Sequence, residues 1–252
     1  FMNNNKPSEE ELAKRKAQQE QQANQATNTQ KDTHTATFQG IPNDSVALEK
    51  YKASLGAFAY SATLPSAKDG VTVLENKDIK LTISNRGGQP KEVLLKEFKT
   101  YDSLPVYLIK DWNATFNLNF TTAQNQNLSS KDLYFEPTLS ENNGNKVLSM
   151  KLKTSENAYL EYVYTLPKEG YMLDVAVRSQ GLSGVVNTSK PMNIDWKLQA
   201  RRMEKSVTYE NRYTQATVQY DGDRINRLSQ GGNDEQKEEK VNWVAYKQHL
   251  FT

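Results

Sequence analysis

The side chains that could do acid–base or metal chemistry are few in this chain. It has two histidines, His34 and His249, and no cysteine. Without cysteine there is no disulfide, no thiol nucleophile and no zinc–thiolate site. A serine–histidine–acid triad would have to use His249, but no serine lies in a Gly-x-Ser-x-Gly elbow. We therefore expect His249 to be structural, and we expect no metal site and no other cofactor.

Carboxylates gather at three places, each inside a turn or a run of charged residues. The groups are Asp221 with Asp223, Glu9 to Glu11, and Glu235 with Glu238 and Glu239. A glycosidase-type pair needs carboxylates that face each other across a cleft, whereas these positions are typical of solvated loops. The turn Asn-Arg-Gly-Gly at residues 85–88 lacks a lysine and precedes a strand pattern, so it does not predict a phosphate-binding loop. The sequence therefore predicts no enzyme.

Two groups of tyrosines could line a groove for a sugar or a peptide. They are Tyr159, Tyr162 and Tyr164, and further along Tyr209, Tyr213 and Tyr220. Aromatic residues on the faces of a β-sandwich also serve as core residues or cross-strand pairs. The groove interpretation favours a carbohydrate-binding module as an alternative function. An aldose epimerase is a further alternative, which would require activity that depends on His249.

The elements that must position these residues are β-strands. Within residues 76–98, an apolar side chain stands at every second position from 79 to 83, which places these side chains on one face of a strand. Two glycines and Pro90 then turn the chain, and an apolar return strand starts at residue 93. This stretch predicts a β-hairpin that opens the folded domain.

Similar short apolar or alternating runs follow one another along most of the chain. They cover residues 71–74, 106–109, 116–120, 133–135, 146–153, 159–166, 172–178, 192–200, 217–220, 224–228 and 241–248. Gly, Pro, Asn and Asp separate about a dozen such runs, and no long helical pattern lies between them. The pattern predicts an all-β fold, either an antiparallel sandwich or a barrel.

The chain divides into three parts by composition. Residues 1–40 are polar on every side, which predicts a tether that is partly helical or disordered. Residues 41–68 predict a docking segment, with a short helix over 44–58 that Gly56 interrupts. Residues 69–252 contain the strand patterns and predict the sandwich domain.

Charge and hydropathy exclude several classes of partner. The net charge is +2, from 32 basic and 30 acidic residues, and no basic cluster is interleaved with aromatic residues, so we expect no nucleic-acid partner. No run of about 18 apolar residues exists, so none of this chain is expected to span a bilayer. We expect the chain itself to be soluble. Hydrophobicity rises toward Thr252, which favours a fragment of a longer protein.

Three stretches resemble one known family. A strand followed by Asn-Arg-Gly-Gly at residues 79–88, with Val-Leu-Leu at 93–95, resembles the opening of the large periplasmic domain of the YidC membrane protein insertases. The closing run VNWVAYKQHLF at residues 241–251 is similar to the segment that leads this domain back to the second membrane span. The run NKPSEEEL at residues 5–12 resembles Bacteroidetes-type members just after the first span.

The resemblance implies a fold, a place and partners. The fold would be an antiparallel β-supersandwich like that of the galactose mutarotases, on the periplasmic face of the bacterial inner membrane. The domain would be non-catalytic and would assist insertion through contacts with the Sec translocon's accessory subunits and nascent membrane proteins. Four residues of the closing run are candidates for membrane-proximal or partner contacts: Trp243, Tyr246, Lys247 and Phe251.

Overall fold

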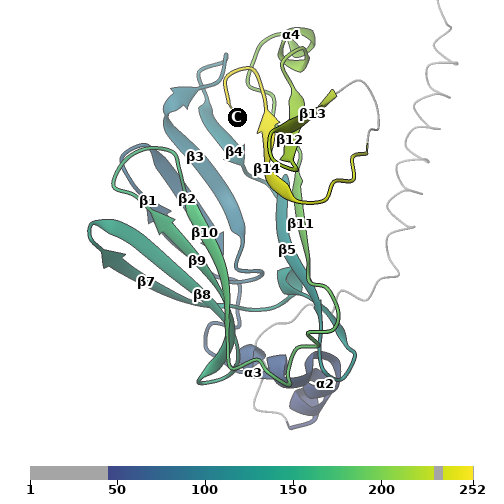
Figure 1. The fold of residues 1–252 in the computed structure, drawn as a ribbon. Coiled ribbons are helices and arrows are strands. Elements are labelled where there is room, and N and C mark those ends of the chain that lie inside the picture. The colour runs from purple at the N-terminus through teal and green to yellow at the C-terminus, as the bar shows by residue number, and fades with distance from the viewer. Residues whose placement is uncertain (1–44, 230–234, 252) are drawn as a thin grey trace, which may run out of the picture. The chain divides into compact units, whose positions relative to one another are not determined.

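The predicted opening hairpin is formed by strands β2 (Ile79–Ser84) and β3 (Pro90–Lys99), whose register pairs Ile79 with Leu95. It belongs to a computed structural model that describes residues 45–229 and 235–251, all within the compact unit of residues 38–252 (Figure 1). The predicted tether, His34 and the acidic run at Glu9 to Glu11 lie outside the described residues. None of the helices in the described part is long and apolar enough to cross a bilayer.

The helix predicted over residues 44–58 is confirmed as α2 (Ser45–Leu55), which a 3-10 turn, η1 (Gly56–Phe58), and a short helix, α3 (Ala59–Ala62), continue. Gly56 has a φ of +57°, in the left-handed region where glycine is favoured, and α2 ends immediately before it. Leu55 and Phe58 belong to the hydrophobic core, and the Phe58 ring lies 5.1 Å from that of Phe120. The apolar side of this segment therefore packs on the sandwich.

Two four-stranded antiparallel sheets come first. One has the order β1-β2-β3-β4 and adds β1 (Val71–Glu75) and β4 (Pro105–Ile109) to the hairpin. The other has the order β10-β9-β8-β7. Its strands are β7 (Glu136–Asn142), β8 (Asn145–Ser155), β9 (Ala158–Leu166) and β10 (Asp174–Gln180).

Two three-stranded antiparallel sheets complete the described fold. The first, in the order β11-β5-β6, contains β5 (Ala114–Thr121), β6 (Asn127–Ser129) and β11 (Asn193–Leu198). The second, in the order β13-β12-β14, contains β12 (Gln215–Tyr220), β13 (Arg224–Ser229) and β14 (Val241–Lys247). The helix α4 (Val207–Asn211) precedes β12. The fold is an all-β antiparallel sandwich with short helices, as predicted.

The core lies between the inner faces of these sheets. Alternate residues of β8 and β9, among them Leu148, Met150 and Leu166, are fully buried because they all point to one side. Across from them, the Phe116 ring of β5 contacts Tyr162 of β9 at 5.5 Å. The apolar residues at alternate positions, from which the strands were predicted, are therefore the residues that fill the core.

The Gly-Gly turn between β2 and β3 reaches into this core. Gly88 has a φ of +61°, and a Cβ added there would lie 3.0 Å from the Phe135 ring and 3.2 Å from the Tyr162 ring. The Tyr164 hydroxyl donates a hydrogen bond of 2.7 Å to the Gly88 carbonyl. The turn is therefore a buried structural bend, which agrees with the prediction that it is not a ligand loop.

One predicted strand is wrong. Residues 133–135 follow the 3-10 turn η2 (Ser130–Asp132) and form no strand, although Phe135 is fully buried and its N–H donates to the Asn85 carbonyl. The apolar run reflects insertion into the core, and its strand-type pairing is limited to one isolated antiparallel bridge between Tyr134 and Arg86. The actual strand, β7, starts one residue later and contains Pro137, which is tolerated because β7 is last in its sheet.

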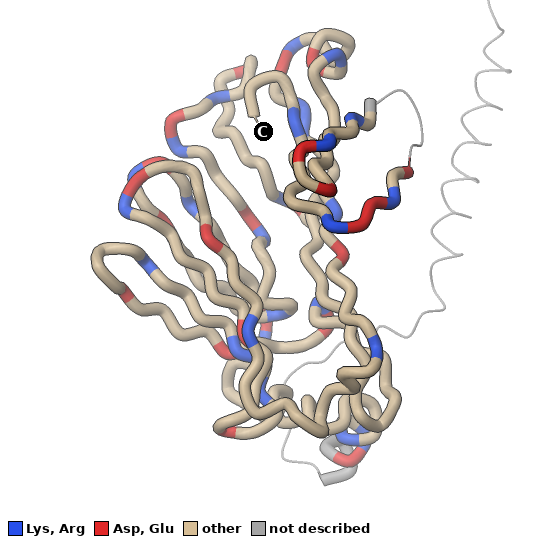
Figure 2. Tube along the Cα trace, in the orientation of Figure 1, with Lys and Arg blue, Asp and Glu red and all other residues tan. Residues whose placement is uncertain are grey.

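Basic and acidic residues are mixed along the chain (Figure 2).

Candidate functional site

Strand β10 extends the inner face of its sheet beyond the covered core. Val175 pairs with Tyr164 and Val177 with Tyr162, so both valines point to the same side as these buried tyrosines. Both valines are nevertheless exposed. The reason is that β10 is the last strand of its sheet, and the opposing layer leaves it uncovered.

Strand β11 likewise extends the inner face of the opposing layer beyond the covered core. Ile194 pairs with Leu118 and Trp196 with Phe116, which places Ile194 and Trp196 on the core side of β5. Each of these two side chains is 57 % exposed. Since Phe116 contacts Tyr162, β10 and β11 flank the same core contact from the two layers. Figure 1 shows β10 in one layer and β11 beside β5 in the other.

Strand β14 adds an aromatic residue to this surface. The Tyr246 ring lies 6.2 Å from that of Trp196, edge to face, and Val244 shares the face of Tyr246 two positions earlier. Both are exposed. We define the open inner face as the side chains Val175, Val177, Ile194, Trp196, Val244 and Tyr246. Exposed apolar surface of this kind is unusual unless something binds to it.

The four predicted contact residues do not share one surface. Tyr246 lies on the open inner face, whereas Trp243 is three positions earlier and points to the opposite side of β14. Lys247 is exposed at the end of β14. The Phe251 ring packs against Phe98 of β3 at 5.5 Å. Of the four, the structure brings Tyr246 alone to the open inner face.

Two of the six predicted groove tyrosines, Tyr162 and Tyr164, are core residues, whereas Tyr209 and Tyr213 of the second group are exposed. Tyr162 is 0 % exposed and Tyr164 is 1 % exposed, so neither ring can line an open groove, and that prediction is wrong for both. They are buried because they occupy the inner positions of β9, at the centre of a sheet. Tyr159 is on the outer face, where its hydroxyl donates to the Gln180 side chain and the Lys151 ammonium lies over its ring.

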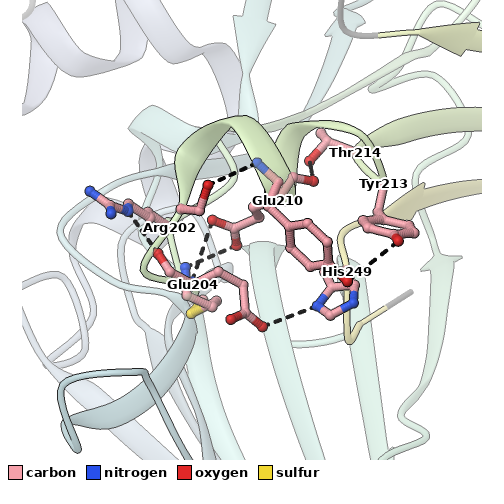
Figure 3. Close-up of polar contacts among 9 residues, drawn as sticks. Arg202, Glu204, Glu210, Tyr213, Thr214 and His249 are labelled. Atoms are coloured by element: carbon pink, nitrogen blue, oxygen red, sulfur yellow. Dashed lines mark hydrogen bonds and ion pairs between the residues drawn. The ribbon is translucent and has the colours of Figure 1, made fainter.

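His249 belongs to a polar cluster that joins the closing segment to α4 (Figure 3). Its Nδ1 lies 3.1 Å from a carboxylate oxygen of Glu204, and its ring contacts Tyr209 at 5.1 Å and Tyr213 at 4.6 Å. The buried Glu210 carboxylate accepts a hydrogen bond of 2.9 Å from the Met203 N–H and a longer one from the Glu204 N–H. The cluster fixes two segments to each other.

Glu210 is predicted to hold the segment before α4 in place. In a Glu210→Ala variant, the buried Met203 N–H would lose its acceptor, which costs about 1–3 kcal/mol. We expect amide hydrogen exchange at Met203 and Glu204 to accelerate by roughly tenfold or more, while exchange in the core strands stays unchanged. Unchanged protection at both amides would contradict the role of Glu210.

A second polar cluster covers β5 and β6. The Asn119 amide donates to Asp195, and its carbonyl accepts from Asn117 and Ser129. The pocket beside it has a volume of about 350 Å³ and includes Asn127 and Asn193. Because the central Asn119 is already bonded on both sides, this cluster stabilises the strands. In the part of the chain that the structure describes, no three His, Cys, Asp or Glu residues converge to hold a metal ion.

The sequence reasoning missed the open inner face and the cluster around Glu210. Alternation identified β10 and β11 but could not show that each is an edge strand, on which inner residues become exposed. A signal was present in Ile194 and Trp196, which alternate with charged Asp195 and Lys197. For Glu210, the Ser206 side chain that accepts from the Tyr209 N–H is a helix N-cap that the sequence could have predicted.

Fold and site together define an antiparallel β-sandwich with an uncovered apolar face. Comparison with protein families narrows this class, because the family model for the YidC periplasmic domain matches residues 71–252. The chain belongs to the YidC periplasmic domain family. Its place is therefore the periplasmic face of the inner membrane, as the resemblance implied.

Curated relatives support this assignment over the whole chain. The membrane protein insertase YidC of Porphyromonas gingivalis W83 is 30 % identical over all of this chain and 40 % of its own length. Those of Bacteroides fragilis and Parabacteroides distasonis are 30 % and 31 % identical, over 98 % and 86 % of this chain and 39 % and 34 % of their own lengths. The chain thus spans about two fifths of these relatives or less. No solved structure matches it.

Proposed function

We propose that this domain is the non-catalytic periplasmic part of an insertase, and that it assists the insertion and folding of inner-membrane proteins by binding their extended apolar segments. The observation that carries the proposal is the open inner face, where core-side residues of two edge strands are exposed. Relatives named membrane protein insertases make apolar segments the relevant class of ligand.

The edges of β10 and β11 suit an extended ligand. Each is last in its sheet, so within the described residues no strand pairs with its outer edge. An extended peptide can add to such an edge through main-chain hydrogen bonds, while every second side chain packs on the adjoining face. With 7 residues in β10 and 6 in β11, either edge accommodates a segment of similar length.

The charge pattern favours an uncharged ligand. The inward positions of the two strands carry no charge: they are Val175, Val177 and Ser179 of β10, and Ile194, Trp196 and Leu198 of β11. The charged residues Asp174, Arg178, Asp195 and Lys197 occupy the outward positions. A buried charge in the ligand would find no partner on this face, which disfavours charged segments.

Photo-crosslinking in the full-length insertase tests the proposal. A crosslinking phenylalanine analogue at position 196 is expected to capture nascent membrane proteins, and the same analogue at the exposed position 139 of β7 is expected not to. If position 196 crosslinks only to the Sec translocon's accessory subunits, the proposal is contradicted. The face would then bind those subunits, the other partner that the resemblance implies.

Peptide binding to the 252-residue chain provides the quantitative test. Trp196→Ser should weaken binding of a fluorescent Leu- and Val-rich peptide by about tenfold or more, because central aromatic contacts dominate such surfaces. Val71→Ser, an exposed position on β1, serves as the matched control and should leave affinity unchanged. Equal affinity in both variants would contradict the proposal. Saturable sugar binding that is lost in Tyr159→Ala would support the carbohydrate-binding alternative instead.

A further inference from the structure

Three segments distant in sequence meet at one end of the domain. Phe98, near the end of β3, packs against Tyr171 of the β9–β10 turn at 5.9 Å and against Phe251 of the closing segment at 5.5 Å. The β3–β4 turn is also tied to residues 201–205, because the Tyr101 N–H donates a hydrogen bond of 3.1 Å to the Met203 carbonyl. These contacts give the end a fixed arrangement.

Large apolar side chains on these segments point into solvent. Met172 is 79 % exposed, Leu250 is 63 % exposed and Leu104 is 57 % exposed. Tyr101 and Tyr171 are also exposed beside them. We call these five side chains the apolar tip. It is separate from the open inner face, because none of its residues lies on β10, β11 or β14.

The turns that carry the apolar tip are held by specific hydrogen bonds. In the β3–β4 turn, the Thr100 N–H donates to the Leu104 carbonyl at 2.8 Å, and the Ser103 N–H donates to the Thr100 carbonyl at 2.9 Å. In the β9–β10 turn, the Asn76 amide donates to the carbonyls of Pro167 and Gly170. Since both turns are fixed from within, the exposed side chains are displayed at a small cost in conformational entropy upon binding.

Cations lie beside the apolar tip. The Arg202 guanidinium stacks 5.3 Å from the centre of the Tyr101 ring and donates to the Glu204 carbonyl at 2.8 Å. Lys205 and Lys99 are exposed on the segments that flank this ring. Acids also lie near the tip: Asp78 and Glu97 act electrostatically on Tyr171, and Asp102 and Glu204 lie on the segments that carry Tyr101 and Arg202. Asp102 accepts a hydrogen bond from the Thr100 hydroxyl, and the Glu204 carboxylate contacts His249.

We propose that the apolar tip and the cations Lys99, Arg202 and Lys205 dock this domain on the headgroup layer of an anionic phospholipid bilayer. Aromatic and apolar side chains with adjacent Lys or Arg are the combination that partitions into a membrane interface. The family places the domain in a membrane protein, so a bilayer surface is always within the same molecule's reach. This inference goes beyond peptide binding, since it concerns a different set of residues.

Vesicle binding by the 252-residue chain tests the inference. The absence of cysteine allows a single polarity-sensitive dye to be attached at Leu104→Cys, or at Leu139→Cys on β7 as a control of similar exposure, 57 % against 51 %. With vesicles of phosphatidylethanolamine and phosphatidylglycerol, we expect the emission of the dye at position 104 to shift to the blue. The dye at position 139 should show no shift. Equal shifts at both positions, or none at position 104, would overturn the inference.

A second measurement separates the contribution of the cations to vesicle binding from that of the apolar side chains. Lys205→Glu should weaken binding to the same vesicles by about fivefold or more, because a cation near an anionic surface contributes about that factor. The change should have no effect with vesicles of phosphatidylcholine alone. Lys190→Glu, an exposed charge in the β10–β11 connection, is the matched control. Loss of binding in Lys190→Glu equal to that in Lys205→Glu would show non-specific attraction and refute a defined docking surface.

Discussion

Replacing Gly88 with alanine is expected to lower the free energy of unfolding by about 2–4 kcal/mol. Two costs add. The φ of +61° places an L residue in the left-handed region, and the new methyl group would stand 3.0 Å from the Phe135 ring and 3.2 Å from the Tyr162 ring. Both rings are fully buried and cannot move aside without opening the core. Urea unfolding followed by tryptophan fluorescence measures the change.

Gly184→Ala is the matched control for this prediction. Gly184 also has a positive φ, of +75°, but nothing lies within 4 Å of the position where a Cβ would be built. This variant therefore has the backbone cost alone, about 1–2 kcal/mol. The prediction depends on the difference between the two variants. Equal destabilisation would mean that the Gly88 turn is looser than its contacts with the aromatic rings indicate.

The second large effect is a loss of stability in alkali. Burial raises the pKa of the Tyr162 phenol from 10.0 to about 12, with the Ser130 hydroxyl opposing the shift. Burial also raises the pKa of Tyr164, and the neighbouring Tyr162 adds to that effect. Between about pH 10 and 12 the folded chain keeps protons that the unfolded chain releases. The free energy of unfolding should therefore fall as pH rises through this window, by about 3 kcal/mol for Tyr162 alone.

Two phenylalanine variants identify the source of this alkaline loss. The stability of Tyr162→Phe should fall less steeply with pH above 10. It should change little at pH 7, because the buried Tyr162 hydroxyl lies near the Ser130 hydroxyl but meets no partner at hydrogen-bond geometry among the described residues. Tyr164→Phe should cost about 1–2 kcal/mol at pH 7, since the Gly88 carbonyl loses its donor. Unfolding curves of Tyr162→Phe and the parent chain that coincide from pH 9 to 12 would refute the assignment to Tyr162.

Much of the fold followed from alternation and turn chemistry. The hairpin of β2 and β3, the Asp-Gly bend at residues 221–222 between β12 and β13, and the helix interrupted at Gly56 could all be predicted, because each depends on neighbours in sequence. The run at residues 133–135 could not, since a buried loop and a buried strand have the same apolar composition. Pro90 was expected to lie in the turn before the return strand, but it starts β3, where the first residue tolerates a proline.

The candidate site was harder to predict because it depends on strand order. Tyr162 and Val177 both lie on strands whose apolar residues alternate with polar ones, yet Tyr162 is fully buried and Val177 is exposed. The difference is that β9 has a neighbour on each side and β10 has one. Sequence spacing contains no such information. The same limit explains why Trp243 and Tyr246, three positions apart on one strand, were grouped although they point to opposite faces.

The unpaired edges of β10 and β11 also set a limit on concentration. An edge that accepts an extended ligand accepts a strand of another copy, so the isolated domain is predicted to aggregate through these edges as its concentration rises. The outward charges of Asp174, Arg178, Asp195 and Lys197 oppose parallel, in-register stacking of identical edges, because that arrangement brings like charges together. Salt screens the repulsion between these charges, so the solubility of the isolated domain should decrease as the salt concentration rises.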